Sequence, residues 1–242
     1  IEEVKFTDAA VEAQLREMLQ VNRNTVIFSN ELWNVTSFTM PTDATSYEDL
    51  KYLPYLEELI INDGHSGDLS VISSFAKLTT LHISNTSVSA EDLAMIGSLP
   101  KLERLTLSNC SLSTTAGLEK ATAIRYLDLS NNTIRNITAL SQMTNLQEVY
   151  LQNNALNELD SLSAIKTITK LNVSGNALTS LAPICNISGL TWLDASNNQL
   201  TSVDQIGDLT MLKELYLSKN QLTSISSIVS CTNLQILYLD NN

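Results

Sequence analysis

The stretch IRYLDLSNNTIRNITALSQMTN spans residues 124–145, and LQEVYLQNNALNELDSLSAIKT follows it directly at residues 146–167. Apolar residues fall at the same positions in both stretches, and an asparagine occupies the ninth position of each. Similarity at a fixed period indicates that the chain is built from stacked structural repeats. The period therefore has to be found before single helices or strands are assigned.

The same pattern, L-x-x-L-x-L-x-x-N-x-L, continues through most of the chain. Its units begin at nine positions: Leu56, Leu78, Leu102, Ile124, Leu146, Ile168, Leu190, Leu212 and Leu234. A weaker unit begins near Val35, and from Leu102 to Leu234 every step between unit starts equals the length of the two quoted stretches. The step from Leu78 to Leu102 is longer than this period. Within it, Ser89 and Asp92 resemble a capping box, which predicts one true helical turn there. This period and pattern are typical of a leucine-rich repeat array.

Each position of the pattern has a physical role. The central L-x-L, as at residues 127–129, alternates inward and outward as a short strand does, and the strands of successive units stack in parallel. Period-three apolar spacing in the second half, as at Ile137, Leu140 and Met143, favours a tight 3₁₀-like return. Side-chain amides are expected to satisfy buried backbone groups in the turn between these halves. These amides belong to Asn132, Asn154, Asn176, Asn198, Asn220 and Asn242.

We therefore predict an α/β fold. It is a leucine-rich repeat solenoid, a curved right-handed horseshoe with a parallel sheet on its concave side and mostly 3₁₀ turns on its convex side. A helical cap is expected over residues 1–34, and the repeat array over residues 35–242 as about ten units, the last one incomplete. The last unit stops at Asn242 without a capping segment, so we expect the natural polypeptide to continue beyond it.

The segment at residues 1–34 does not follow the repeat. Within it, FTDAAVEAQLREMLQ, at residues 6–20, carries four apolar residues on one helical face: Val11, Leu15, Met18 and Leu19. Thr7 or Asp8 can serve as the N-cap of this helix. A short connecting strand is expected near residues 24–28. Such a segment would cover the first strand of a solenoid.

Three segments around the cap have a specific order. They are the Phe6-Thr7-Asp8 start of the helix, NELWNVTSF at residues 30–38, and YEDLKYLPYLEEL at residues 47–59, which leads into the first full repeat. Together with the repeat units they resemble bacterial internalin-type leucine-rich repeat proteins, over essentially the whole chain. The resemblance implies a secreted or cell-surface protein whose horseshoe binds a partner. The chain begins at Ile1 rather than Met, which favours a signal peptide that has been removed.

Five large rings of the array fall at outward positions of the strands. Aromatic residues are only 5% of the chain, and architecture does not require them at positions that face solvent. Rings with acidic neighbours provide rigid contact area and orienting charge for a protein partner. The predicted partner-binding residues are Tyr126, Asp128, Glu148, Tyr150, Trp192, Asp194, Glu214, Tyr216 and Tyr238. The alternative is that the rings are good strand formers that pack against one another across neighbouring strands.

Composition excludes several classes of function. The formal net charge of −12 disfavours binding to a nucleic-acid backbone or to an anionic membrane surface. No apolar run approaches the roughly 20 residues that span a bilayer. Cys110, Cys185 and Cys231 have no C-x-x-C spacing. We expect Cys110 and Cys231 to be buried free thiols and Cys185 to be partly exposed.

Catalysis and cofactor binding have little support. His65 and His82 are the only histidines, and the repeat geometry suggests no catalytic triad. Two histidines near a carboxylate are more often solvated surface groups, so we expect no metal site from these histidines with Glu58 and Asp63. We therefore predict a non-enzymatic module without a cofactor that binds a protein, or a glycan, through its concave face. The alternative is a structural or self-assembly spacer within a longer surface protein, and the oligomeric state is left open.

Overall fold

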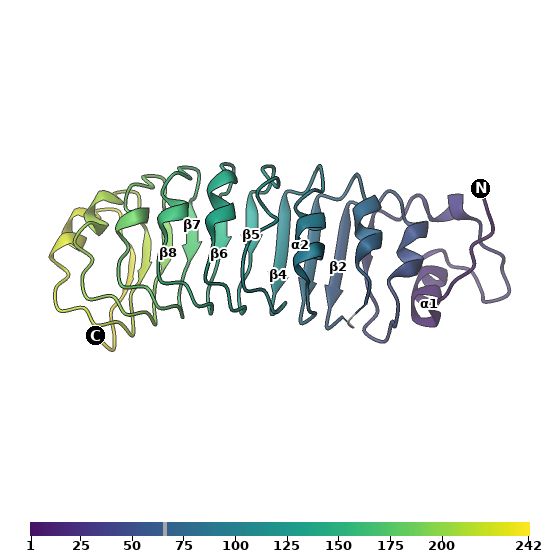
Figure 1. The fold of residues 1–242 in the computed structure, drawn as a ribbon, viewed down its shortest axis with the longest axis horizontal. Helices are drawn as coiled ribbons and strands as arrows, with labels where there is room; N and C mark the ends of the chain where they lie inside the picture. The colour runs from purple at the N-terminus through teal and green to yellow at the C-terminus, as the bar shows by residue number, and fades with distance from the viewer. Residues whose placement is uncertain (65–66) are drawn as a thin grey trace.

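The computed structural model describes residues 1–64 and 67–242. Ten strands of these residues form one parallel sheet in chain order, side by side along the long axis of the molecule (Figure 1). This arrangement confirms the predicted α/β leucine-rich repeat solenoid. The strands are β1 (Ser37–Thr39), β2 (Glu58–Asn62), β3 (Thr80–Ser84), β4 (Arg104–Ser108), β5 (Tyr126–Asp128), β6 (Glu148–Tyr150), β7 (Lys170–Asn172), β8 (Trp192–Asp194), β9 (Glu214–Tyr216) and β10 (Ile236–Tyr238).

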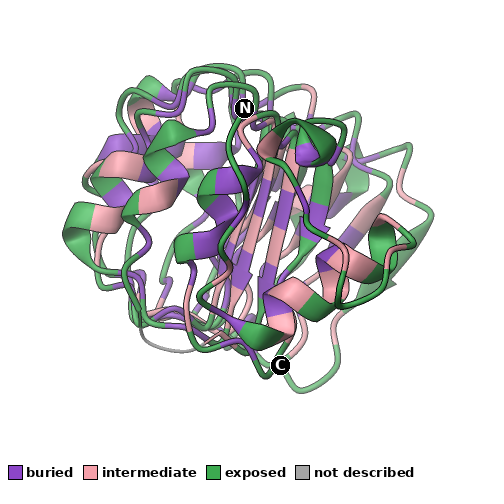
Figure 2. Ribbon diagram, turned by 90° about the vertical axis from the view of Figure 1, so that its right-hand side faces the viewer, coloured by how far each residue is buried: buried purple, intermediate pink, exposed green. Residues whose placement is uncertain are grey.

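Equivalent residues of successive repeats stack in register. Leu105 of β4 pairs with Leu127 of β5, which pairs with Val149 of β6, and all three are fully buried. Figure 2 shows buried and half-buried residues alternating along the strands, as period-two geometry requires. Each repeat thus adds several buried aliphatic side chains, each worth about 1.5–3 kcal/mol of hydrophobic stabilisation.

Short helical turns form the opposite side of the solenoid. Ile137, Leu140 and Met143 are buried around the turn at residues 138–142, as the period-three spacing predicts. The 3₁₀ turns are η1 (Ser29–Leu32), η2 (Glu48–Tyr52), η3 (Ser70–Ser74), η4 (Thr138–Gln142), η5 (Asp160–Leu162), η6 (Ala182–Ile184), η7 (Ile206–Asp208) and η8 (Ser226–Ser230). In the longer step between Leu78 and Leu102 a turn is α-helical, α2 (Ala90–Ile96), and Ser89 and Asp92 form its capping box. This confirms the prediction for that step.

Two rows of residues, stacked from repeat to repeat, stabilise the turns that follow the strands. The inner asparagine ladder is the row from Asn132 to Asn242 predicted above, and the outer ladder is the row of residues directly before it. In the inner ladder, Asn132 Oδ1 accepts the Cys110 and Leu112 amides at 2.9 and 3.1 Å, and its Nδ2 donates to the Leu107 carbonyl at 2.8 Å. This confirms the role predicted for these asparagines. In the outer ladder, the residue just before the inner asparagine takes a left-handed backbone, with φ of 57° at Asn131. Short polar side chains tolerate this conformation better than most.

The cap helix, α1 (Ala9–Met18), lies at the N-terminal end (Figure 1). Asp8 is its N-cap, as predicted, and Val11 and Leu15 are buried. Met18 is 46% exposed, because the helix ends there and its last side chain lies beyond the surface that the helix covers. Residues 24–28 form only an isolated bridge, between Phe28 and Glu3, so the predicted strand there was wrong. The division into a cap (1–34) and an array (35–242) stays a prediction.

Two buried carboxylates fasten the cap to the first repeats. Asp8 Oδ1 accepts the Ala10 and Val11 amides of α1, while its Oδ2 accepts the Thr45 amide at 2.6 Å. Asp49 in η2 is fully buried and accepts hydrogen bonds from the Thr7 and Asp8 amides and from the Thr7 hydroxyl. Each carboxylate therefore joins the start of α1 to the segment at residues 45–49.

Candidate functional site

The side chains that alternate with the buried leucines form the outer face of the sheet, which is the predicted concave face. The strand register aligns them in rows across the strands. One row runs from Tyr126 on β5 to Trp192 on β8, and a second from Asp128 on β5 to Tyr216 on β9. All nine residues predicted to bind a partner lie on this face, and all are half-buried except Tyr238, which is 53% exposed.

The structure divides these residues into two clusters. The first cluster consists of Tyr126, Asp128, Glu148 and Tyr150. The two tyrosine rings lie with centroids 5.4 Å apart, and the Tyr150 hydroxyl donates to Glu148 Oε2 at 3.0 Å. The guanidinium carbon of Arg104 lies 4.1 Å from the centroid of the Tyr126 ring, and Lys170 Nζ lies 3.5 Å from Glu148 Oε2.

The second cluster consists of Trp192, Asp194, Glu214 and Tyr216. The Trp192 and Tyr216 rings lie with centroids 5.6 Å apart, and the Tyr216 hydroxyl donates to Glu214 Oε2 at 2.8 Å. Tyr238 extends this cluster, because its ring stacks on Tyr216 with centroids 5.2 Å apart. The ring packing expected from the alternative interpretation is therefore present, together with partial exposure of every ring.

The two clusters have matching residue types, apart from Trp192 in place of Tyr126, and similar ring geometry. Each residue of the second cluster lies three repeats after its counterpart in the first, as Trp192 lies after Tyr126. The aromatic residue, the aspartate, the glutamate and the tyrosine follow in the same order. Arg104 and Lys170 are related by the same three-repeat spacing, although neither was among the predicted residues. This shared spacing of the basic residues is the sequence signal that would have found them.

Tyr126, Tyr150 and Tyr216 remain neutral well above physiological pH. Burial raises the pKa of Tyr150 to about 12, and its hydrogen bond to Glu148 adds to this effect. The pKa of Tyr126 is raised as well, by burial first and then by the charge of Asp128. For Tyr216, the hydrogen bond to Glu214 is the largest cause of a raised pKa. The Tyr150 and Tyr216 hydroxyls thus keep the proton that orients the two glutamates.

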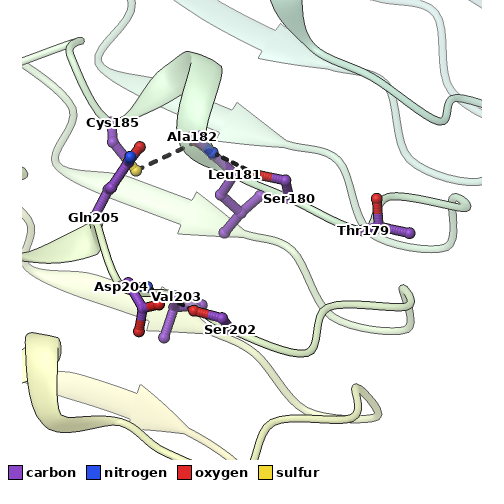
Figure 3. Close-up of a pocket in the computed structure, with 9 residues that line it drawn as sticks. All are labelled: Thr179, Ser180, Leu181, Ala182, Cys185, Ser202, Val203, Asp204 and Gln205. Carbon is purple, nitrogen blue, oxygen red and sulfur yellow. Dashed lines mark hydrogen bonds between the residues drawn. The ribbon is translucent and has the colours of Figure 1, made fainter.

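A hollow of about 170 Å³ lies away from these clusters, on the side of the 3₁₀ turns (Figure 3). Its walls come from two successive return segments and consist of residues 179–182, Cys185 and residues 202–205. Ser180 Oγ accepts the Ala182 amide and Ser202 Oγ accepts the Asp204 amide, both at 3.1 Å. These polar groups are therefore used in local turns, and the hollow is the space between adjacent repeats.

Cys185 lines this hollow but is only 5% exposed. The prediction that it is partly exposed was wrong, because the residue directly follows η6 and its thiol turns back to donate to the Leu181 carbonyl at 3.3 Å. Burial raises the pKa of Cys185 to about 11, so the sulfur is a protonated thiol rather than a nucleophile. Cys110 and Cys231 are buried free thiols, as predicted.

His82 belongs to no recognisable metal site among the described residues. His82 on β3 pairs in register with Ile60 rather than with Glu58. Among residues 1–64 and 67–242, no group of three His, Cys, Asp or Glu side chains is placed to hold a metal ion. His65 lies outside the described residues. In the same part of the chain, no helix has the length and apolar character needed to span a membrane.

Comparison with known proteins agrees with this geometry. A leucine-rich repeat family model matches residues 122–164 and 210–242. Comparison with curated protein sequences gives no significant match. Among solved structures, an internalin (inlF) from Listeria monocytogenes is 25% identical with a TM-score of 0.67, and the match covers 98% of this chain and 83% of that one.

Two further Listeria monocytogenes structures share the fold. Internalin C2 is 23% identical with a TM-score of 0.69, over 97% of this chain and 94% of that chain. The functional domain of InlJ, which includes a cysteine ladder, is 20% identical with a TM-score of 0.67, over 98% of this chain and 60% of that chain.

Proposed function

Because the chain is a leucine-rich repeat protein of the bacterial internalin type, we propose that it binds a protein partner through the outer face of β5 to β10. In this proposal residues 1–34 serve as a cap and residues 35–242 as the binding array. The protein acts without catalysis, at the cell surface or after secretion. A glycan is the second class of ligand that such a ring-lined face could take.

The observation that carries the proposal is the gathering of half-exposed rings on one face. Five large aromatic side chains lie there in two clusters, each with two acidic neighbours. Aromatic residues in the centre of an interface contribute most of the binding energy in many complexes. The carboxylates would orient a positively charged partner and increase its rate of association, because opposite charges attract as the two proteins approach.

Variants of the second cluster test this function. Trp192→Ala and Tyr216→Ala are expected to weaken partner binding about 30-fold or more each, as loss of a central aromatic residue does at about 2 kcal/mol. Surface proteins of candidate partner cells would be captured on the wild-type protein, and affinity then measured with the purified partner. Trp33→Ala is the matched control, because Trp33 is an exposed tryptophan (40%) that lies before the repeat array. Equal affinity of all three variants would refute the proposal.

The folded state of each variant has to be checked in parallel. Ring pairs contribute about 0.5–1.5 kcal/mol beyond their buried area, so some loss of stability is expected. Urea unfolding separates this effect from loss of binding, because a variant that remains folded at the assay temperature can lose affinity only through its surface.

Self-assembly is the alternative function. Light scattering over a wide concentration range tests it, since a self-assembling spacer forms a dimer or larger species as concentration rises. A monomer throughout the range contradicts self-assembly. A dimer that Trp192→Ala dissociates would mean that the outer face binds a second copy of this chain.

A further inference from the structure

The two clusters differ in how their charges are balanced, although their residues correspond one to one. In the first cluster the chain supplies its own cations. Arg104 lies over the Tyr126 ring at 4.1 Å, and Lys170 pairs with Glu148 at 3.5 Å. A guanidinium over a ring and an ammonium beside a carboxylate are both favourable contacts. The first cluster therefore shows which chemical group this arrangement of ring and acid accommodates.

The second cluster has the corresponding rings and acids, with Trp192 in place of Tyr126, but not the cations. Lys170 is the counterpart of Arg104, yet its ammonium pairs with Glu148 instead of lying over Trp192. None of the ion pairs and cation–π contacts among the described residues involves Asp194, Glu214, Trp192 or Tyr216. This cluster thus presents two carboxylates that form no ion pair within the described part of the chain, beside two rings that have no cation of that part over them.

Each acid of the second cluster is held in place and keeps one oxygen for a ligand. Asp194 Oδ1 accepts the Ser196 amide at 2.9 Å, and Glu214 Oε2 accepts the Tyr216 hydroxyl at 2.8 Å. These bonds leave Asp194 Oδ2 and Glu214 Oε1 as the free acceptors. Both side chains are half-buried, so an ion pair formed there is screened by water less than one on an open surface.

We propose that the second cluster binds a basic side chain, an arginine, from a protein partner. This inference rests on the proposed function and names the chemistry of the contact. A guanidinium is planar, stacks on aromatic rings and donates to carboxylate oxygens through a fixed fork, so it satisfies ring and acid together. Tryptophan is the best of the aromatic residues for a cation. The net charge of −12 favours approach of a basic segment over the whole surface.

The two tryptophans of the chain make a direct test possible. Each gives one indole N–H signal in an NMR spectrum of ¹⁵N-labelled protein, and Trp33→Phe assigns them. The probe is the acetylated and amidated peptide Gly-Ser-Arg-Ser-Gly, titrated to millimolar concentration. Its control is the same peptide with citrulline, which keeps the shape of arginine but has no charge. The Trp192 signal is expected to shift saturably with the arginine peptide, and the Trp33 signal to stay in place.

Paired variants locate the contact. The double substitution Asp194→Asn and Glu214→Gln is expected to abolish the shift of Trp192, since it removes both charges and keeps both shapes. The matched control, Glu158→Gln and Asp160→Asn, removes the same charge from two exposed acids outside the outer face and should leave the arginine affinity within about twofold. Citrulline should bind about fivefold more weakly or worse, as loss of about 1 kcal/mol implies, and 1 M salt should weaken the arginine peptide similarly.

Three results would overturn the inference: no shift with the arginine peptide, equal shifts with arginine and citrulline, or equal losses in both paired variants. None of them would refute the proposed function, which fails only if Trp192→Ala and Tyr216→Ala leave partner binding intact. A partner that requires Trp192 but is indifferent to the charge at Asp194 and Glu214 would use the rings alone.

Discussion

Asp49 Oδ2 accepts a hydrogen bond from the backbone amide of Asp8, 2.8 Å away. Asp8 in turn caps α1 and binds the Thr45 amide with its own carboxylate. The two aspartates therefore connect the cap helix and the segment before β2 in both directions. Neither connection uses apolar packing, so both can be tested by changing polar atoms alone.

Removal of the Asp49 carboxylate should loosen the cap. Asp49→Ala leaves the Thr7 and Asp8 amides without their acceptor, and an unpaired buried amide costs about 1–3 kcal/mol. We expect the free energy of unfolding to fall by about 2 kcal/mol or more, and the amides of α1 to exchange hydrogen faster. Urea unfolding and hydrogen exchange measure these effects. Glu48→Ala is the control, because Glu48 makes only an exposed pair with Lys51; equal stability of the two variants would contradict the prediction.

Lowering the pH should remove the stabilisation that the ionised Asp8 carboxylate gives to the fold. Burial alone would raise the pKa of Asp8, but hydrogen bonds from Thr45, Val11 and Ala10 outweigh it and hold the pKa below the ordinary value of 3.8. A carboxyl group with a lowered pKa stabilises the fold above its ordinary pKa, and this stabilisation is lost as the pH falls through the lowered value. The stability difference between the wild type and Asp8→Asn, measured in urea from neutral pH to about pH 2.5, should therefore shrink towards low pH. A difference that stays constant or grows would be evidence against this assignment.

The inner ladder should be sensitive to loss of one amide. Asn154 accepts the Ile134 amide at 2.9 Å and donates to the Leu129 and Leu151 carbonyls at 3.0 Å. Asn154→Ala is expected to lower the free energy of unfolding by about 1–3 kcal/mol. Asn157→Ala removes an exposed asparagine from the same repeat and should change it by less than about 0.5 kcal/mol. Thermal melting of both variants, with no difference between them, would show that the ladder amide contributes little.

Gly175 should tolerate asparagine better than alanine. Its φ is 65°, and an added Cβ would lie 2.3 Å from Asn153 Oδ1. Alanine is strained in this left-handed conformation by about 1–2 kcal/mol. Asparagine adopts the conformation more easily and could donate to Asn153, as Asn153 itself donates to Asn131 at 2.9 Å. In urea unfolding we expect the wild type to be the most stable, Gly175→Asn to be less stable and Gly175→Ala to be the least stable. The reverse order of the two variants would mean that the outer ladder does not stabilise the chain.

The period of the sequence was sufficient to predict most of the fold. Each repeat gives its residues nearly the same surroundings, so the strand at residues 126–128 and its register with residues 148–150 followed from the spacing alone. The left-handed residue at Asn131 did not follow. The asparagine pair is visible in the sequence, but the conformation of its first member depends on the turn of the backbone. Met18 was misplaced for a similar reason, since apolar spacing does not show where a helix leaves the surface it covers.

The candidate site was predicted in position but not in its contacts. Period-two alternation placed the nine residues on one face. The pattern could not show that Lys170 would pair with Glu148 instead of lying over Trp192. The rotamer of a long side chain depends on its neighbours in space, which the pattern does not specify. The same holds for Arg104 over Tyr126. The division of one expected surface into two clusters follows from the rotamers of these side chains.

The two clusters are separated by three repeats, so deleting whole repeats between them would change the distance from one cluster to the other. Each repeat contacts mainly its neighbours, and residues 155–176 form one complete period between Asn154 and Ala177. Their excision would shorten the distance between the clusters by one strand spacing, about 4.8 Å. The four residues that define each cluster would stay in the chain, and Lys170, the cation beside Glu148, would be lost. A ligand that touches one cluster would bind the shortened protein normally, whereas a rigid ligand that spans both would not. The number of attachment points on a partner could thus be counted by deletion.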